Sequence, residues 1–169
     1  MNEQKFNYYA DLLKSYIEEN ARLILKPPTT YLNHPFVDPG SIYNGNLWDW
    51  DSFWAVYALF GLVDEQSPEK EEIKELYIKH AKGNIENFIE HQLEDGYIPM
   101  MINNSKLPEP YLNLKHKEGV IMNMHKPFLC QQIALISGFS GDHEWAANYV
   151  NQLELYFSCY DKYYYHDKT

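Results

Sequence analysis

The sequence contains no apolar stretch long enough to cross a lipid bilayer. Its longest apolar run extends from Phe53 to Val63, whereas a membrane-spanning helix needs about 20 apolar residues. The first residues, Met-Asn-Glu-Gln-Lys, also lack the apolar core of a signal peptide. We therefore expect no membrane partner and a cytoplasmic protein.

Basic side chains are scarce as well. Lysine and arginine together number 14 against 24 acidic residues, which gives a net charge of −10. Proteins that bind nucleic acids present basic patches to the phosphate backbone. The charge therefore argues against a nucleic-acid partner.

Only two cysteines occur, Cys130 and Cys159. Both lie in apolar, helical patterns, which is typical of reduced structural thiols. No cluster of cysteine and histidine has metal-ligand spacing, and the sequence has neither a glycine-rich phosphate loop nor a Gly-x-Ser-x-Gly motif. We therefore expect neither a metal nor another cofactor.

Aromatic residues, in contrast, are plentiful. They make up 16% of the chain and include 15 tyrosines. This composition suits a folded protein, and a chain of 169 residues is long enough for one domain with a sizeable core. We therefore treat residues 1–169 as parts of one domain.

Apolar residues recur at helical spacing in five segments. These are residues 3–25, 52–62, 67–93, 127–137 and a last segment from about residue 142. The second and fourth segments are apolar nearly all round, so we expect them to be buried, with Phe53 and Trp54 in the core. The other segments are amphipathic. No alternation of apolar and polar residues is sustained enough to predict a sheet.

Two long irregular segments, residues 26–47 and 94–124, each precede a buried helix. Loops of this length are uncommon in compact domains unless they have a function. If amphipathic and buried helices alternate as outer and inner helices, both long loops and the starts of both inner helices meet at one end. We therefore predict an all-α fold, an incomplete toroid of about two and a half α-hairpins, with a loop-built site at its mouth.

The segment NGNLWDWDSFWAVYALFGL, residues 44–62, holds three of the four tryptophans and two aspartates. Tryptophan before a core helix usually packs in the core, and aspartate at a helix start usually caps it. Flat aromatic faces also stack on the C–H faces of sugars, and carboxylates accept hydrogen bonds from vicinal hydroxyls. Because Asp49 and Asp51 are two residues apart, their side chains diverge and do not form the acid–base pair of a glycosidase. We predict that one of them holds substrate.

The motif LWDWDSFW is similar to the Trp-Asp-Ser signature of the (α/α)6-barrel glycoside hydrolases. These include trehalases, the processing α-glucosidases of family 63 and bacterial mannosylglycerate hydrolase-like enzymes. The resemblance implies that Trp50 and Asp51 line a sugar subsite at the barrel centre. Two further stretches, DGYIP at residues 95–99 and MHKPF at residues 124–128, also resemble parts of these enzymes.

In MHKPF, His125 and Lys126 stand where the family often has a Ser-Gln pair. A cation at Lys126 suits a substrate that carries a carboxylate or a phosphate, and the alternative is a solvated loop lysine. The full set of predicted sugar contacts is Trp50, Asp51, Trp48, Asn46, Tyr43, Lys126 and Gln131.

The resemblance implies an inverting mechanism, with one carboxylic acid and one carboxylate on opposite sides of the glycosidic bond. It places both groups beyond Thr169, so we expect no catalytic residue within residues 1–169. An open arc of hairpins also exposes the apolar faces of its inner helices. We therefore expect the chain to be the N-terminal portion of a longer enzyme, or to be completed by self-association or by a partner chain.

Three hypotheses for function follow. The leading one is the sugar-binding part of an inverting glycosidase that acts on a small α-linked glucoside or mannoside. The second is a non-catalytic all-α carbohydrate-binding or self-assembling module. The third is a sugar epimerase-like toroid enzyme, a class that generally relies on histidines at the mouth, here His34 and His125. We expect His80 and His91 at the surface.

Overall fold

The structure, a computed structural model, describes residues 2–40, 44–63, 66–104, 116–117, 120–121 and 123–165. These residues are mostly helical, as the sequence predicts. The helices are α1 (Glu3–Ala21), the short 3-10 helix η1 (Arg22–Ile24), α2 (Asp49–Gly61), α3 (Lys70–Glu90), α5 (Leu129–Ser140), α6 (His143–Ala147) and α7 (Val150–Tyr164).

Three short antiparallel ladders lie in the long irregular segments, so the expectation of no sheet is wrong. The ladders pair β1 (Leu25–Lys26) with β2 (Phe36–Val37), β3 (Leu47–Trp48) with β4 (Met101–Ile102), and β5 (His116–Lys117) with β6 (Val120–Ile121). Each strand has only two residues, which is too few to show an alternating pattern in the sequence.

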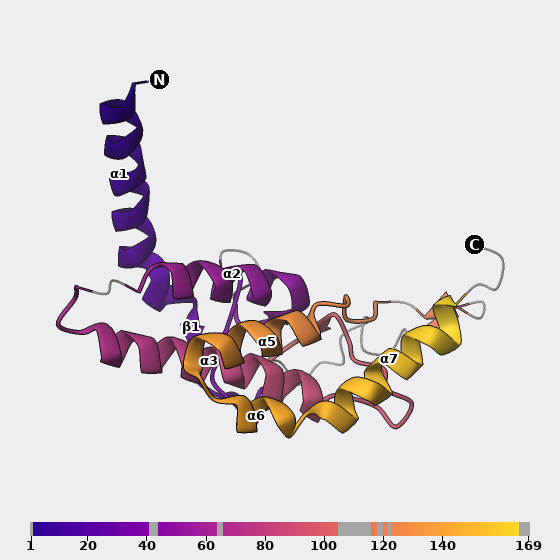
Figure 1. The fold of residues 1–169 in the computed structure, drawn as a ribbon. Coiled ribbons are helices and arrows are strands. Elements are labelled where there is room, and N and C mark those ends of the chain that lie inside the picture. Colours follow the sequence, from indigo (N-terminus) through magenta and orange to yellow (C-terminus); the bar gives the residue numbers. More distant parts are fainter. Residues whose placement is uncertain are drawn as a thin grey trace.

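Helix α3 forms the centre of the body, and α2 and α5 both pack against it (Figure 1). Its buried side chains Ile85 and Phe88 belong to one continuous apolar core. That core also includes Leu47 beside α2, Leu129 at the start of α5 and Tyr156 of α7. The packing of the two predicted inner helices against one central helix holds their first turns in a fixed relation.

The first irregular segment runs close over α3. The backbone N–H of Val37 donates to Oδ1 of Asn84 on that helix, at 2.8 Å. Gly83 makes room for the crossing, because a Cβ at this position would lie 1.9 Å from the carbonyl oxygen of Pro35. This contact anchors the strand β2 and the residues that follow it.

The last predicted helix is divided in two. Gly141 ends α5 in the left-handed conformation, with φ of 75°, which is the usual role of glycine after a helix. Asp142 then caps α6, because its Oδ1 accepts a hydrogen bond from the N–H of Trp145 at 2.9 Å. The segment from about residue 142 therefore forms the short α6 and the longer α7.

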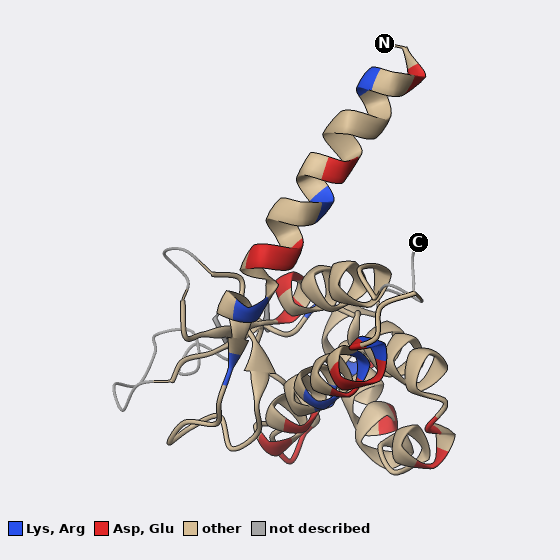
Figure 2. Cartoon of the chain, turned by 90° about the vertical axis from the view of Figure 1, so that its left-hand side faces the viewer, with Lys and Arg blue, Asp and Glu red and all other residues tan. Residues whose placement is uncertain are grey.

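Helix α1 leaves the body of the molecule. Asn2 caps its start by accepting a hydrogen bond from the N–H of Lys5 at 3.0 Å. In both views the helix projects away from the rest of the chain (Figures 1 and 2). Ala21, in its last turn, is its only buried residue. The predicted helix is therefore present, but most of its large apolar side chains are exposed to solvent.

Two predictions about individual side chains are wrong. Trp54, expected in the core, is 54% exposed on α2, so α2 is not buried on most sides. Its neighbour Phe53 is half-buried and stacks on Phe128, with ring centroids 5.3 Å apart. His80, expected at the surface, is buried, and its Nδ1 donates to the carbonyl oxygen of Leu76 at 2.8 Å.

Candidate functional site

The starts of α2 and α5 lie together, as the sequence predicts. The β3–β4 ladder pairs Trp48 with Met101. The N–H of Asp49 donates to the carbonyl oxygen of Met100 at 2.9 Å, and the N–H of Met100 donates to the carbonyl oxygen of Asn123 at 2.8 Å. The two long irregular segments therefore run side by side immediately before the two helices.

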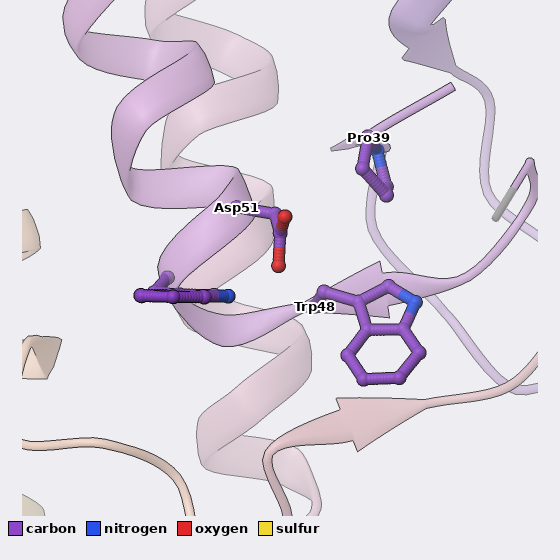
Figure 3. Close-up of a pocket in the computed structure, with 4 residues that line it drawn as sticks. Pro39, Trp48 and Asp51 are labelled. Atoms are coloured by element: carbon purple, nitrogen blue, oxygen red, sulfur yellow. The ribbon is translucent and has the colours of Figure 1, made fainter. Parts of the chain in front are cut away.

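A cavity of about 210 Å³ opens beside the start of α2. The residues that line it are Pro39, Trp48, Trp50 and Asp51. The close-up in Figure 3 shows the Asp51 carboxylate and the Trp48 indole facing the same space, with Pro39 across from them. Three of the predicted sugar contacts, Trp48, Trp50 and Asp51, are thus brought together in one cavity.

The local backbone explains this arrangement. Trp48 is the half-buried last residue of β3, and Trp50 and Asp51 follow in the first turn of α2. A carboxylate in the first turn is stabilised by the helix dipole. The sequence predicted that this helix begins at Ser52, but it begins at Asp49. The earlier start places the Trp-Asp cluster at the junction of ladder and helix.

Asp49 is fully buried and ties the two segments together. Its Oδ2 accepts a hydrogen bond from the N–H of Lys126 at 2.7 Å, and its Oδ1 accepts one from the N–H of Trp50 at 2.6 Å. Its carbonyl oxygen accepts from Nε2 of Gln132 at 3.1 Å. Because its carboxylate is enclosed, Asp49 has no surface for a ligand. Of the two aspartates, Asp51 is the one that faces the cavity.

Lys126 belongs to the same group of contacts. Its Nζ lies 3.3 Å from Oδ1 of Asp49 and 4.9 Å from the centroid of the Trp50 ring, which is within cation–π range. The ammonium group is therefore balanced by a buried carboxylate and supports one face of the indole. The Lys126 side chain is 38% exposed but paired, and it is not among the described residues that line the cavity.

Two other predicted contacts that the structure describes, Gln131 and Asn46, are not among the residues that line the cavity. Gln131 is exposed on α5, whereas its neighbour Gln132 is the buried side chain that reaches Asp49. One residue along a helix turns a side chain by about 100°, so Gln131 points away from Asp49, and neither glutamine is among the residues that line the cavity. Asn46 is half-buried just before β3 and is not a lining residue. Tyr43 lies outside the described residues.

Two tyrosines that the sequence did not single out, Tyr156 and Tyr160, contact the backbone of His125 and Lys126. The Tyr156 hydroxyl donates to the carbonyl oxygens of Lys126 at 2.7 Å and His125 at 3.1 Å, and the Tyr160 hydroxyl also donates to the carbonyl oxygen of His125. The Nδ1 of His125 donates to the carbonyl oxygen of Lys126. Burial lowers the pKa of His125 to about 4, so the imidazole is neutral near pH 7.

These tyrosines gave no sequence signal for this role, because their helical spacing in α7 is also that of ordinary core residues. His34, in the first irregular segment, lies elsewhere and packs against α3. Its Nδ1 is 3.0 Å from Oε2 of Glu86 and its Nε2 is 2.8 Å from Oε1 of Glu90. Neither His34 nor His125 lines the cavity, so the epimerase hypothesis loses its two mouth histidines.

Comparisons with protein-family models, with curated proteins and with solved structures find no match to this chain. Within the part of the chain that the structure describes, no helix is long and apolar enough to span a membrane. The same residues include no group of three or more histidine, cysteine, aspartate or glutamate side chains placed to hold a metal ion.

Proposed function

We propose that this chain is the sugar-binding part of an inverting glycoside hydrolase that acts on a small α-linked glucoside or mannoside. The observation that supports this most directly is the Asp51 carboxylate in one cavity with the indoles of Trp48 and Trp50. The LWDWDSFW motif, similar to the signature of (α/α)6-barrel glycoside hydrolases, assigns Trp50 and Asp51 to the same role.

The chemistry of the cavity suits one sugar ring. Its volume of about 210 Å³ is smaller than the roughly 300–1,000 Å³ of pockets for drug-sized ligands. An indole packs on the C–H face of a pyranose, and the Asp51 carboxylate accepts charge-assisted hydrogen bonds from hydroxyls. The described residues that line the cavity include no cation, and the nearby Lys126 is paired with Asp49. We therefore favour a neutral sugar over one that carries a carboxylate or a phosphate.

Among the described residues that line the cavity, Asp51 supplies the one carboxylate. An inverting glycosidase needs two carboxyl groups about 6.5–9.5 Å apart. We therefore expect residues 1–169 alone to bind sugar and to hydrolyse nothing. Under the second hypothesis, a non-catalytic carbohydrate-binding module, sugar binding in the same cavity is the only activity.

The test is a titration of the chain with glucose, mannose and their α-linked disaccharides, followed by calorimetry. Hydrogen bonds to a charged group contribute about 1.5–3 kcal/mol, so Asp51→Asn is expected to weaken binding by about 10–100-fold. Trp50→Ala is expected to weaken it as well. Its matched control is Trp54→Ala, because this exposed indole lies one turn further on α2 and does not line the cavity.

Equal affinity of the parent chain and Asp51→Asn would remove the cavity as the sugar site. Release of monosaccharide by the parent chain alone would contradict the absence of the acid and the base from residues 1–169.

A further inference from the structure

Helix α1 presents an apolar stripe that nothing in the described chain covers. Phe6, Tyr9, Leu13 and Tyr16 follow one another at intervals of three, four and three residues, the spacing of a coiled-coil seam. Each of the four side chains is between 49% and 64% exposed. The stripe is therefore continuous along the helix and open to solvent.

A helix in this position needs a partner. Most of the stability of a protein helix comes from packing of its apolar face, and an isolated helix of this length is marginal in water. Of the 19 residues of α1, only Ala21 is buried. The body of the chain thus supports the last turn, and the preceding turns have an unpartnered face.

Charges along one edge of the stripe indicate what kind of partner fits. Lys5, Leu12 and Glu19 are seven residues apart, so they lie on one edge, with a basic residue near the start and an acidic residue near the end. The other edge has Ala10 and Ile17, also seven residues apart. When two copies of this edge run in opposite directions, the basic end of one therefore meets the acidic end of the other.

We propose that α1 pairs with α1 of a second copy of this chain in an antiparallel two-helix contact. In an antiparallel pair, like edges face each other. Lys5 of each copy then meets Glu19 of the other, and Leu12 meets its own counterpart near the two-fold axis. This pairing is independent of the sugar cavity.

The parallel alternative is disfavoured on two grounds. It would turn the edge with Lys5 and Glu19 toward the apolar edge with Ala10 and Ile17, and the charges would have no partners. It would also bring both bodies to the same end, because each body joins α1 at its C-terminal end (Figure 1). The antiparallel pair keeps the two bodies apart, and each chain has a charge of −10.

The area is enough for a specific but reversible contact. The four side chains of the stripe and Leu12 are all exposed. With roughly 100 Å² free on each, they cover about 500 Å² on each copy, or about 1,000 Å² in total, near the lower limit for a specific interface. Tyr16 also lines an apolar cavity of about 200 Å³ between the C-terminal turns of α1 and residues Ala55 and Ala58 of α2. The antiparallel pair directs Phe6 of the second copy toward this cavity.

Sedimentation velocity of the whole chain over a wide concentration range tests the pairing. We expect a dimer of twice the 20.0 kDa chain mass that dissociates on dilution. Leu13→Glu in the stripe is expected to abolish it, whereas Asn7→Glu on the opposite face leaves it unchanged. The tryptophans all lie outside α1, so their fluorescence confirms that the body remains folded in each variant.

A charge exchange tests the orientation. Lys5→Glu alone and Glu19→Lys alone each place two like-charged contacts in the antiparallel pair and are expected to weaken it by about tenfold. The double variant restores both contacts and is expected to dimerise as the parent does. A parent chain that stays monomeric overturns the proposal and leaves the face to another protein. A double variant that dimerises no more strongly than the single variants also overturns it.

Discussion

Two aspartates in the same helical turn have different environments. Asp49 is enclosed and accepts backbone N–H groups from Trp50 and Lys126, whereas Asp51 is half-buried and lines the cavity. The residues alone predicted that one of the two holds a substrate, and only the resemblance to (α/α)6-barrel glycoside hydrolases pointed to Asp51. The difference comes from helix geometry, which separates the two side chains by about 200° around the axis.

We expect this difference to appear in stability. Asp49→Ala removes the acceptor of two partly buried N–H groups and of the Lys126 ammonium. It should lower the free energy of unfolding by about 3 kcal/mol. Asp51→Ala should cost less than about 1 kcal/mol, mainly through the helix dipole. Urea unfolding followed by tryptophan fluorescence measures both, and equal losses would contradict the role of Asp49.

His125 should make stability depend on pH. Burial lowers its pKa to about 4 in the folded chain, against about 6.5 when unfolded. Between these values the unfolded chain binds a proton that the folded chain does not. Stability therefore falls as the pH falls through this window, by about 3 kcal/mol over its whole width.

His125→Asn isolates this contribution, because the asparagine amide can still donate to the carbonyl oxygen that His125 contacts. Urea unfolding near about pH 7 and about pH 4.5 should show a smaller loss on acidification for the variant than for the parent. Carboxylates titrate in both proteins and cancel in the comparison. Identical losses would mean that the His125 pKa is not lowered in the folded chain.

At the scale of elements, the sequence predicted what depends on local spacing. The helices α1, α2, α3 and α5 all correspond to segments with helical periodicity. The start of α2 was missed because no side chain caps it. Its N-cap residue is Trp48, and the start is fixed by the ladder with β4 and by Lys126. These partners are distant in sequence, so no local pattern indicates them.

Two glycines within helices should respond in opposite ways to alanine. At Gly83 of α3 a Cβ would meet the backbone of Pro35 at 1.9 Å, whereas at Gly138 of α5 it would meet nothing within 4 Å. Gly138→Ala should therefore stabilise the chain by about 0.5–1 kcal/mol through helix propensity. Gly83→Ala should destabilise it, because α3 and the segment before β2 must move apart. Thermal unfolding of both variants measures the two signs, and a stabilised Gly83→Ala would contradict the close crossing.

At the scale of the molecule, several large apolar side chains are exposed, although the helical spacing of the sequence predicts that they lie in a core. They lie on α1 and on the outer face of α2, which exposes Trp54 and Tyr57. Residue spacing identified these faces as apolar, but what covers them is decided by contacts that the sequence pattern does not specify. The complete toroid therefore stays a prediction, and the uncovered faces are where further chain or a second copy would add.

Hydrogen exchange on the whole chain should distinguish the two parts of the molecule. At low concentration, amides in the first turns of α1 should exchange with little protection, because a lone helix opens readily. Amides of α3, at the centre of the core, should be strongly protected at every concentration. When the concentration is raised, protection of α1 should increase in proportion to the dimer, while that of α3 stays constant. Strong protection of α1 in a dilute, monomeric sample would instead mean that the body itself stabilises the helix, and the second copy would not be needed to cover it.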